Sequence, residues 1–244
     1  MIELKNLTKR YGKTLAVDCL SLSVSRGEIF GFIGPNGAGK TTTIRMMGGV
    51  LAPTGGSVII DGINMADDPE SVKKRIGFIP DRPFLYEKLT GMEFMRFSAD
   101  LYGVNERIFL EETPTLLKKF AIYDWAHELI ESYSHGMKQR LIISAALLHD
   151  PTVIIVDEPM VGLDPAAIKM VKDVFRELAK RGKTIFMSTH TLAVAEDICD
   201  RIGIIHRGSL IATGTTGDLR RDAGGEGADL EEVFLILTED QAVP

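Results

Sequence analysis

The chain has few cysteines and no long apolar run. Only Cys19 and Cys199 occur among its 244 residues, neither at a metal-binding spacing, and we assign them no function. The longest uncharged stretch, about residues 184–195, falls short of the roughly 20 apolar residues that span a bilayer. The N-terminus lacks the apolar segment of a secretory signal. We therefore expect a soluble, cytosolic protein.

Positive charge is not concentrated anywhere in the sequence. The chain has 28 lysines and arginines against 34 acidic residues, a formal net charge of −6. Because proteins that bind nucleic acid usually present clustered basic residues, we expect no nucleic-acid partner. Low-complexity sequence is nearly absent as well. The exception, residues 222–228 with the sequence DAGGEGA, predicts a flexible joint before a short final element at 229–238.

Residues 34–41 read GPNGAGKT, which has the spacing of a phosphate-binding loop. Its small residues let successive backbone NH groups curl around phosphate oxygens, and a helix that begins near Gly39 directs its positive end at the same anion. Lys40 can reach the outer phosphates, and the hydroxyl of Thr41 can bind Mg²⁺. The loop therefore predicts a nucleoside triphosphate ligand with magnesium.

The context of this loop argues against a chance match. By composition alone the pattern would occur in roughly one chain of this length in a hundred. Here the apolar residues 28–33 predict a buried strand that enters the loop, and residues 41–50 predict a helix that leaves it. Strand, glycine-rich turn and helix are the setting that phosphate binding needs.

A second apolar segment ends in two carboxylates. Residues 153–158 read VIIVDE, which is typical of a buried parallel strand that delivers acidic side chains to the edge of a sheet. Asp157 is then placed to hold the magnesium shell, and Glu158 to polarise an attacking water. Alone the pattern is weak, because many strands end in a charged turn. With the phosphate loop it completes a magnesium-triphosphate site.

The segments that follow predict a helix and another strand. Asp164 and Pro165 are typical of a helix N-cap and a first helical position. The apolar residues 184–189 then lead to His190. A lone histidine after a strand is usually structural, but this one falls at the same predicted sheet edge as Asp157. We predict a role for it at the terminal phosphate.

Residues 133–140 read YSHGMKQR, and with this segment the chain resembles the ATPases of ATP-binding cassette (ABC) transporters. That family carries an LSGGQ-like signature shortly before the strand that ends in acidic residues. The order of motifs also agrees, with the phosphate loop first, then the signature, DEP at 157–159, GLD at 162–164 and finally His190. The resemblance covers about residues 1–215.

The resemblance implies a role for individual residues. Tyr11 would stack on adenine, and Val17 would lie near the ribose. Glu158 would be the catalytic base, supported by Lys40 and His190, and Asp164 would belong to the loop that communicates between subunits. The phosphate loop would bind ATP through Asn36, Gly37, Ala38, Gly39, Lys40, Thr41 and Thr42.

In this family the signature grips the ATP bound to the opposite subunit, so Ser134, Gly136 and Met137 would contact a nucleotide held by a second chain. A serine and a glycine before a helix offer a hydroxyl and unpaired NH groups, which suit a phosphate. The alternative is a simple N-cap by Ser134.

Three residues of the signature depart from the family pattern. Tyr133 replaces the usual leucine, His135 the first glycine, and Met137 the glutamine. Ser134 and Gly136 are kept, so we expect the function to be kept. The form YSxGM resembles the branch of exporters with type-2 permeases, and the C-terminal segment LEEVFLILT resembles the ending of that branch.

A further departure is Asp81, which aligns with the family's Q-loop glutamine. A carboxylate beside a triphosphate is repelled by about 1 kcal/mol at 4 Å in water and by several times more in a drier site. A magnesium ion between the two would reverse the sign. We therefore expect Asp81 to contact the metal or its water.

The resemblance implies an α/β fold, a P-loop NTPase core of the ABC ATPase type with a mixed central sheet, an N-terminal antiparallel β part and a helical subdomain. We expect the ATPase domain at residues 1–215, a helical lobe inserted at about 82–149, and a short C-terminal extension at 216–244. The aromatic residues of the lobe are either core or a docking surface for a partner. The segment 84–86 leaves both readings open.

Together these features predict an ATP-binding and ATP-hydrolysing subunit of an ABC transporter, in the exporter branch. Its partners would be a separate membrane permease and a second ATPase subunit, identical or homologous, in a head-to-tail dimer. It would lie on the inner face of the cell membrane. The alternatives are a non-transport ABC ATPase that acts on nucleic acid or the ribosome, and an unrelated P-loop GTPase or kinase. The GTPase alternative lacks support, because the sequence has no NKxD motif, with which GTPases recognise the guanine base.

Overall fold

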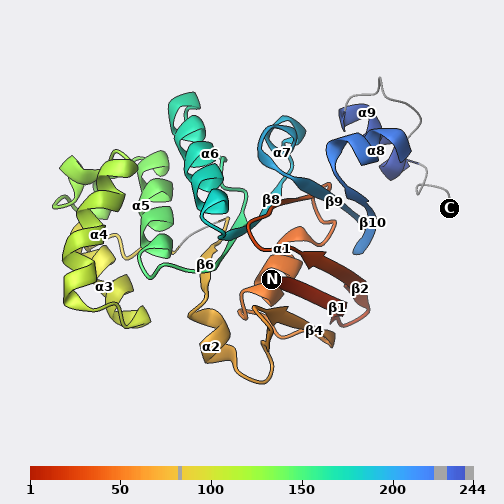
Figure 1. Ribbon diagram of the computed structural model, residues 1–244, viewed down its shortest axis with the longest axis horizontal. Helices are drawn as coiled ribbons and strands as arrows, with labels where there is room; N and C mark the ends of the chain where they lie inside the picture. The colour runs from red at the N-terminus through yellow and green to blue at the C-terminus, as the bar shows by residue number, and fades with distance from the viewer. Residues whose placement is uncertain (82–83, 223–229, 240–244) are drawn as a thin grey trace.

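Two β-sheets form the centre of the molecule (Figure 1). The computed structural model describes residues 1–81, 84–222 and 230–239. The antiparallel sheet has the order β2–β1–β4–β5, with β1 (Ile2–Tyr11), β2 (Thr14–Val24), β4 (Gly55–Ile60) and β5 (Ile63–Asn64). The larger sheet has the order β10–β9–β3–β8–β7–β6, with β3 (Ile29–Ile33), β6 (Ile76–Ile79), β7 (Val153–Asp157), β8 (Thr184–Thr189), β9 (Arg201–His206) and β10 (Ser209–Gly214). The predicted α/β class is confirmed.

The larger sheet is mixed, as expected. Its strands run parallel except at the edge, where β10 pairs antiparallel with β9. Every residue of β3, β7 and β8 is buried, which explains their nearly continuous apolar sequences, since a parallel strand is covered on both faces. The strands predicted at 28–33 and 153–158 are each one residue shorter in the structure.

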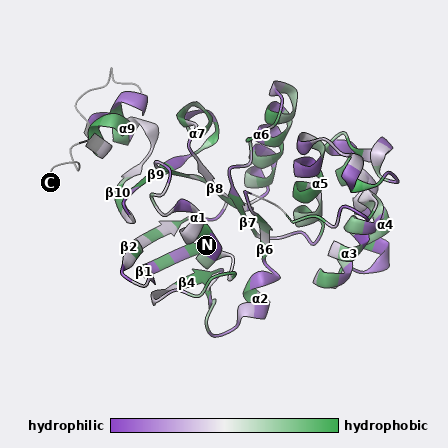
Figure 2. Ribbon diagram, turned by 180° about the vertical axis from the view of Figure 1, so that it is seen from behind, coloured by the Kyte–Doolittle hydropathy of each residue, from purple (hydrophilic) through white to green (hydrophobic). Residues whose placement is uncertain are grey.

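Helices cover both faces of this sheet. They are α1 (Lys40–Met47), α2 (Pro69–Lys73), α6 (Pro165–Lys180) and α7 (Leu192–Ile198). Helix α6 starts as predicted, because the Asp164 carboxylate accepts a hydrogen bond from the NH of Ala167 at 2.8 Å and Pro165 takes the first helical position. In Figure 2 helix α6 shows alternating apolar and polar bands, since one of its faces is buried, whereas residues 141–145 of α5 are all buried.

A helical lobe occupies one end of the molecule (Figure 1). It contains α3 (Gly91–Tyr102), α4 (Glu106–Lys119) and α5 (His135–Leu147), with short 3-10 turns at Tyr123–Trp125 and Ile130–Ser132. Between residues 84 and 149 no strand forms apart from one isolated bridge between Thr90 and Leu129. A capping box at Thr90 and Glu93 starts α3 and so sets where the lobe begins to be helical.

His149 joins this lobe to the sheet. Its ring stacks on Tyr102 at the end of α3, with ring centroids 3.8 Å apart and planes 9° apart. Its Nε2 lies 3.1 Å from the carbonyl oxygen of Ile76 on β6, which makes Nε2 the protonated nitrogen. Burial lowers the pKa of His149 to about 4. The imidazole is therefore neutral at pH 7 and acts as a structural contact.

The C-terminal helices lie at the opposite end (Figure 1). They are α8 (Thr216–Asp222) and α9 (Leu230–Glu239), and α9 agrees with the short element expected at 229–238. Leu219, Leu230 and Val233 pack with Ala195 of α7 and with the apolar residues of β9 in one cluster. The predicted flexible joint, beyond Asp222, lies outside the described residues.

Candidate functional site

The phosphate loop lies between β3 and α1. Gly37 and Gly39 have φ angles of 79° and 110°, which favour glycine. A Cβ atom on Gly39 would lie 2.5 Å from the carbonyl oxygen of Ala16, and one on Gly34 would lie 2.3 Å from that of Ile205. No side chain caps α1, so the NH groups of its first turn are available for an anion.

Lys40 is buried at the start of α1. Its Nζ donates to the carbonyl oxygens of Gly34 at 2.6 Å and Pro35 at 3.2 Å. Burial lowers the pKa of Lys40, and the carboxylates of Glu158 and Asp157 oppose this effect. The ammonium group is thus held between the loop and the acidic end of β7.

The end of β7 presents two carboxylates that differ in exposure. Asp157 is 2% exposed and accepts a hydrogen bond from the hydroxyl of Ser188 on the neighbouring strand. Glu158 has a φ of 53°, a left-handed conformation that non-glycine residues seldom adopt. Its Oε1 lies 2.9 Å from Nδ1 of His190, which follows β8. The predicted base and the predicted phosphate-sensing histidine are therefore in direct contact.

One cavity of about 350 Å³ unites most of the predicted residues. Its walls bring together parts of the chain that are up to about 170 residues apart, because β3, β8 and β7 are neighbours and end at the same sheet edge. It is lined by Ala16, Asn36, Gly37, Gly39, Lys40, Thr41, Thr42, Asp81, Glu158, Val161 and His190.

Three other residues predicted for nucleotide binding, Ala38, Val17 and Tyr11, do not line this cavity. Ala38 is buried within the loop, and Val17 is buried, its Cγ2 3.4 Å from the Cβ position of Gly39. Tyr11 does not line the cavity. It is half exposed at the end of β1, where the Nζ of Lys9 lies 5.3 Å from its ring centroid.

The signature residues lie outside the cavity of their own chain. The Ser134 Oγ accepts a hydrogen bond from the NH of Met137 at 3.3 Å and so caps α5. A Cβ atom on Gly136 would lie 3.5 Å from Cδ2 of Leu163, so the signature packs against the loop that precedes Asp164. Within one chain, Ser134 and Asp164 each act as a helix N-cap, which agrees with a structural role for both residues.

The donor set fits magnesium bound together with a nucleotide. Within the described ranges no group of three or more His, Cys, Asp or Glu side chains could hold a metal by itself. Mg²⁺ commonly uses one or two carboxylates together with hydroxyl and phosphate oxygens. Thr41 in the cavity wall and the nearby Asp157 supply that kind of incomplete set.

Sequence reasoning missed three residues at this site. Ala16 and Val161 line the cavity, and the hydroxyl of Ser188 donates a hydrogen bond to Asp157. Ala16 and Val161 carry no reactive group and stand in no phosphate motif. The only signal for Ser188 is its position two residues before His190 at the end of a strand.

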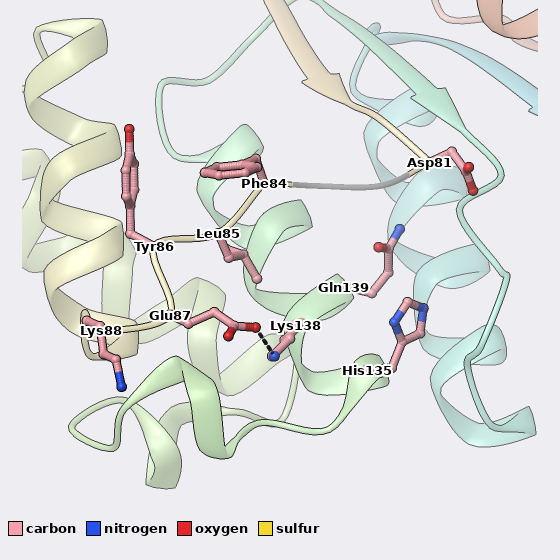
Figure 3. A pocket seen from close by; sticks show the side chains of 9 residues that line it. All are labelled: Asp81, Phe84, Leu85, Tyr86, Glu87, Lys88, His135, Lys138 and Gln139. Atoms are coloured by element: carbon pink, nitrogen blue, oxygen red, sulfur yellow. Dashed lines mark hydrogen bonds and ion pairs between the residues drawn. The ribbon is translucent and has the colours of Figure 1, made fainter.

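A second hollow, of about 730 Å³, lies between the sheet and the helical lobe (Figure 3). Phe84 is 87% exposed, and its ring meets that of Tyr86 edge to face, while Tyr86 meets Phe97 in the same way. Phe94, by contrast, is core. Figure 3 shows the ion pair between Glu87 and Lys138 on the wall of this groove, with Asp81 at its other side. Asp81 lines both hollows.

Over the described parts of the chain, no helix is long and apolar enough to cross a membrane.

Comparison with known proteins gives consistent matches. The family described as "ABC transporter" matches residues 17–161. The ABC-type transporter ATP-binding protein EcsA of Bacillus subtilis is 38% identical over 242 residues, which cover 99% of this chain and 98% of that protein. The bacitracin transport ATP-binding protein BcrA of Bacillus licheniformis is 42% identical over 212 residues, covering 86% and 68%.

Solved structures agree with the fold. The structure of an ATP-binding subunit of an ABC transporter superposes with a TM-score of 0.92 at 38% identity and covers 97% of this chain and 99% of that chain. A bacterial ABC transporter cassette solved as a dimer has a TM-score of 0.77 at 28% identity, covering 88% and 98%. The predicted P-loop core of this type is confirmed.

Proposed function

The chain belongs to the family of ABC transporter ATP-binding proteins, and on that premise we propose that it drives an exporter whose membrane-spanning permease is a separate chain. As a member of this family it binds and hydrolyses ATP. The observation that carries the proposal is the single cavity in which the phosphate loop, Glu158 and His190 meet. A second relevant feature is the exposed aromatic groove beside it.

Hydrolysis begins with the triphosphate on the loop. The first turn of α1 and the ammonium group of Lys40 bind phosphate oxygens, with Nζ moving from the loop carbonyls to the phosphate. Glu158 accepts a proton from the attacking water. His190 orients that carboxylate through Nδ1–H, and in its imidazolium form, with both ring nitrogens protonated, Nε2 would donate to the terminal phosphate.

Magnesium, when bound, neutralises charge on the phosphate oxygens. The residues that would hold it are Thr41, through its hydroxyl, and Asp157, through its carboxylate. We assign Asp81 to the same shell, directly or through a water, because it lines the cavity just beyond the end of β6, the strand beside β7. A carboxylate there is favourable only if a cation lies between it and the triphosphate.

A test of Asp81 follows from its charge. We expect Asp81→Ala to raise the Mg²⁺ concentration needed for half-maximal ATP hydrolysis by about tenfold, as loss of an outer-shell ligand commonly does. Titrating Mg²⁺ at fixed ATP measures this, with Asp67→Ala on the exposed surface as the control. An unchanged Mg²⁺ dependence together with an unchanged rate would remove Asp81 from the metal site.

The active form is proposed to be a head-to-tail dimer that encloses two ATP molecules. The Ser134 hydroxyl and the NH groups at the start of α5 would bind the ATP held by the facing copy. The signature residues do not line the cavity of their own chain, which is consistent with a role toward a partner. A similar cassette has been solved as a dimer, which supports a dimeric active form.

The groove of Figure 3 is proposed to receive the permease. Large exposed apolar side chains around a hollow are typical of protein interaction sites, and Phe84 is the most exposed of those described. Because Asp81 lines this groove and the ATP cavity, one segment would connect docking with hydrolysis. The chain would then lie on the inner face of the cell membrane. Export, rather than import, is supported by the resemblance of the YSxGM signature to the exporter branch, and the similarity to BcrA supports a role in transport.

We expect Phe84→Asp to weaken binding to the permease more than tenfold, which is the effect of removing a central aromatic contact. Basal ATP hydrolysis by the purified chain should not change, because Phe84 lies outside the catalytic cavity. The measurement is retention of a multi-spanning membrane protein on the tagged chain after detergent extraction. Val50→Asp, which alters another exposed apolar residue away from the groove, is the matched control. Copurification with RNA or DNA instead would favour a non-transport ATPase.

A further inference from the structure

Ser188 on β8 contacts both acidic residues at the end of β7. It lies directly opposite Asp157 in the parallel register and is fully buried. Its hydroxyl donates a hydrogen bond to Oδ1 of Asp157. The same Oγ lies 3.2 Å from the backbone NH of Glu158 and accepts a hydrogen bond from it. One small side chain therefore joins the two carboxylate residues on which hydrolysis depends.

The contact to the NH of Glu158 bears on an unusual backbone conformation. A φ of 53° is unfavourable for a glutamate, because its Cβ crowds the following carbonyl group. Such a conformation persists only where neighbouring groups hold it. Here the NH of Glu158 donates to both oxygens of Ser188, the carbonyl and the hydroxyl, each at 3.2 Å.

The carboxylate of Glu158 is held by the same strand end. Its Oε1 lies 2.9 Å from Nδ1 of His190, and its Oε2 lies 3.4 Å from the backbone NH of His190. The backbone end and the side-chain end of Glu158 are thus both fixed by residues 188–190. Of these contacts, only the hydroxyl of Ser188 also reaches Asp157.

The contact to Asp157 fixes the rotation of that carboxylate. A hydroxyl that donates to Oδ1 favours one orientation of the side chain and leaves Oδ2 outside this hydrogen bond. Residues that hydrogen-bond a metal-binding carboxylate from behind commonly change metal affinity or activity by about 10–100-fold when they are removed. Ser188 occupies such a position relative to Asp157.

We propose that Ser188 is a positioning residue for ATP hydrolysis, whose hydroxyl orients Asp157 toward Mg²⁺ and holds Glu158 in its left-handed conformation toward the attacking water. This inference rests on the proposed roles of Asp157 and Glu158. The alternative is that the hydroxyl merely satisfies a buried carboxylate and supports the sheet. The two readings differ in what Ser188→Ala does to magnesium binding.

The test compares variants of the full chain. Ser188→Ala removes the hydroxyl, and Ser188→Cys fills the site with a slightly larger side chain while replacing the hydroxyl with a weak donor. Ser188→Thr restores the hydroxyl. Ser144→Ala is the matched control, because Ser144 is also fully buried and donates to the carbonyl oxygen of Arg140 at 2.8 Å, away from the cavity.

We expect the alanine and cysteine variants to bind ATP in EDTA within about twofold of the wild type, while their kcat falls by about 10–100-fold. Their apparent Mg²⁺ affinity, measured as the Mg²⁺ concentration that half-saturates the change in ATP binding, should weaken about tenfold or more. The threonine variant should recover both quantities. Ser144→Ala should change neither.

The magnesium titration is repeated in a Glu158→Gln background, where turnover does not enter. A loss of Mg²⁺ affinity in that background supports the role through Asp157 even if Glu158 is not the base. Wild-type kcat and Mg²⁺ affinity in Ser188→Ala and Ser188→Cys, with wild-type melting behaviour, would overturn the proposal. A fall in thermal stability alone, without a change in Mg²⁺ affinity or kcat, would also overturn it in favour of the structural reading.

Discussion

Glu158→Gln is expected to lower the rate of ATP hydrolysis by at least about 100-fold, the usual scale for loss of a general base. The substitution keeps the shape of the side chain and an oxygen that can accept from Nδ1 of His190, which lies 2.9 Å from Oε1 in the native chain. It removes the negative charge and the proton acceptor. The cavity should therefore still bind ATP, with an affinity close to that of the wild type.

Two measurements separate the base from a structural role. Phosphate release gives the turnover, and light scattering in the presence of ATP and Mg²⁺ gives the mass of the complex. Because the variant does not complete hydrolysis, it should accumulate as a nucleotide-dependent dimer. Glu112→Gln on the exposed surface of α4 is the control and should behave like the wild type. Wild-type turnover in Glu158→Gln would refute the assignment of the base, and a monomer at saturating ATP would refute the sandwich.

The second large effect is expected at Gly136. Its Cβ position lies 3.5 Å from the nearest atom, an ordinary contact distance, so an added Cβ atom fits without displacing a neighbour. In the proposed dimer Gly136→Asp would place a carboxylate against the triphosphate held by the facing copy. We expect turnover to fall at least about 100-fold, since a charge that repels the transition state opposes the largest electrostatic contribution to such catalysis. Gly136→Asn, with nearly the same shape and no charge, should lose less.

Mixing two inactive variants tests whether the site is shared. Lys40→Ala disables the phosphate loop, and Gly136→Asp disables the signature. In a mixed dimer one site combines both defects and the other is complete. An equal mixture should recover about a quarter of the wild-type rate, because half of the dimers are mixed and each has one working site of two. If the mixture stays inactive although mixed dimers form, the two sites do not work independently. If Gly136→Asp alone is fully active, the signature does not take part.

Local pattern was enough for the elements that carry the motifs. The strand before the phosphate loop, the strand that ends at Asp157 and the helix capped by Asp164 all form within one or two residues of their predicted limits. They could be predicted because burial on both faces, glycine positions and capping residues act over a few neighbouring residues. Local pattern did not show which aromatic residues of the lobe are buried and which are exposed. Phe94 faces the core and Phe84 faces solvent, and only packing between helices decides which.

The sequence by itself determined the chemistry of this protein. The loop at 34–41, the acidic strand end and the signature each require particular functional groups at fixed short spacings, and short spacings survive any arrangement of the rest of the chain. Only the tertiary structure decided which distant residues meet. The strand order β3–β8–β7 sets Ser188 opposite Asp157 and His190 against Glu158, because neighbouring parallel strands align residues in register. That order depends on how whole strands and helices pack, and no local spacing in the sequence records it.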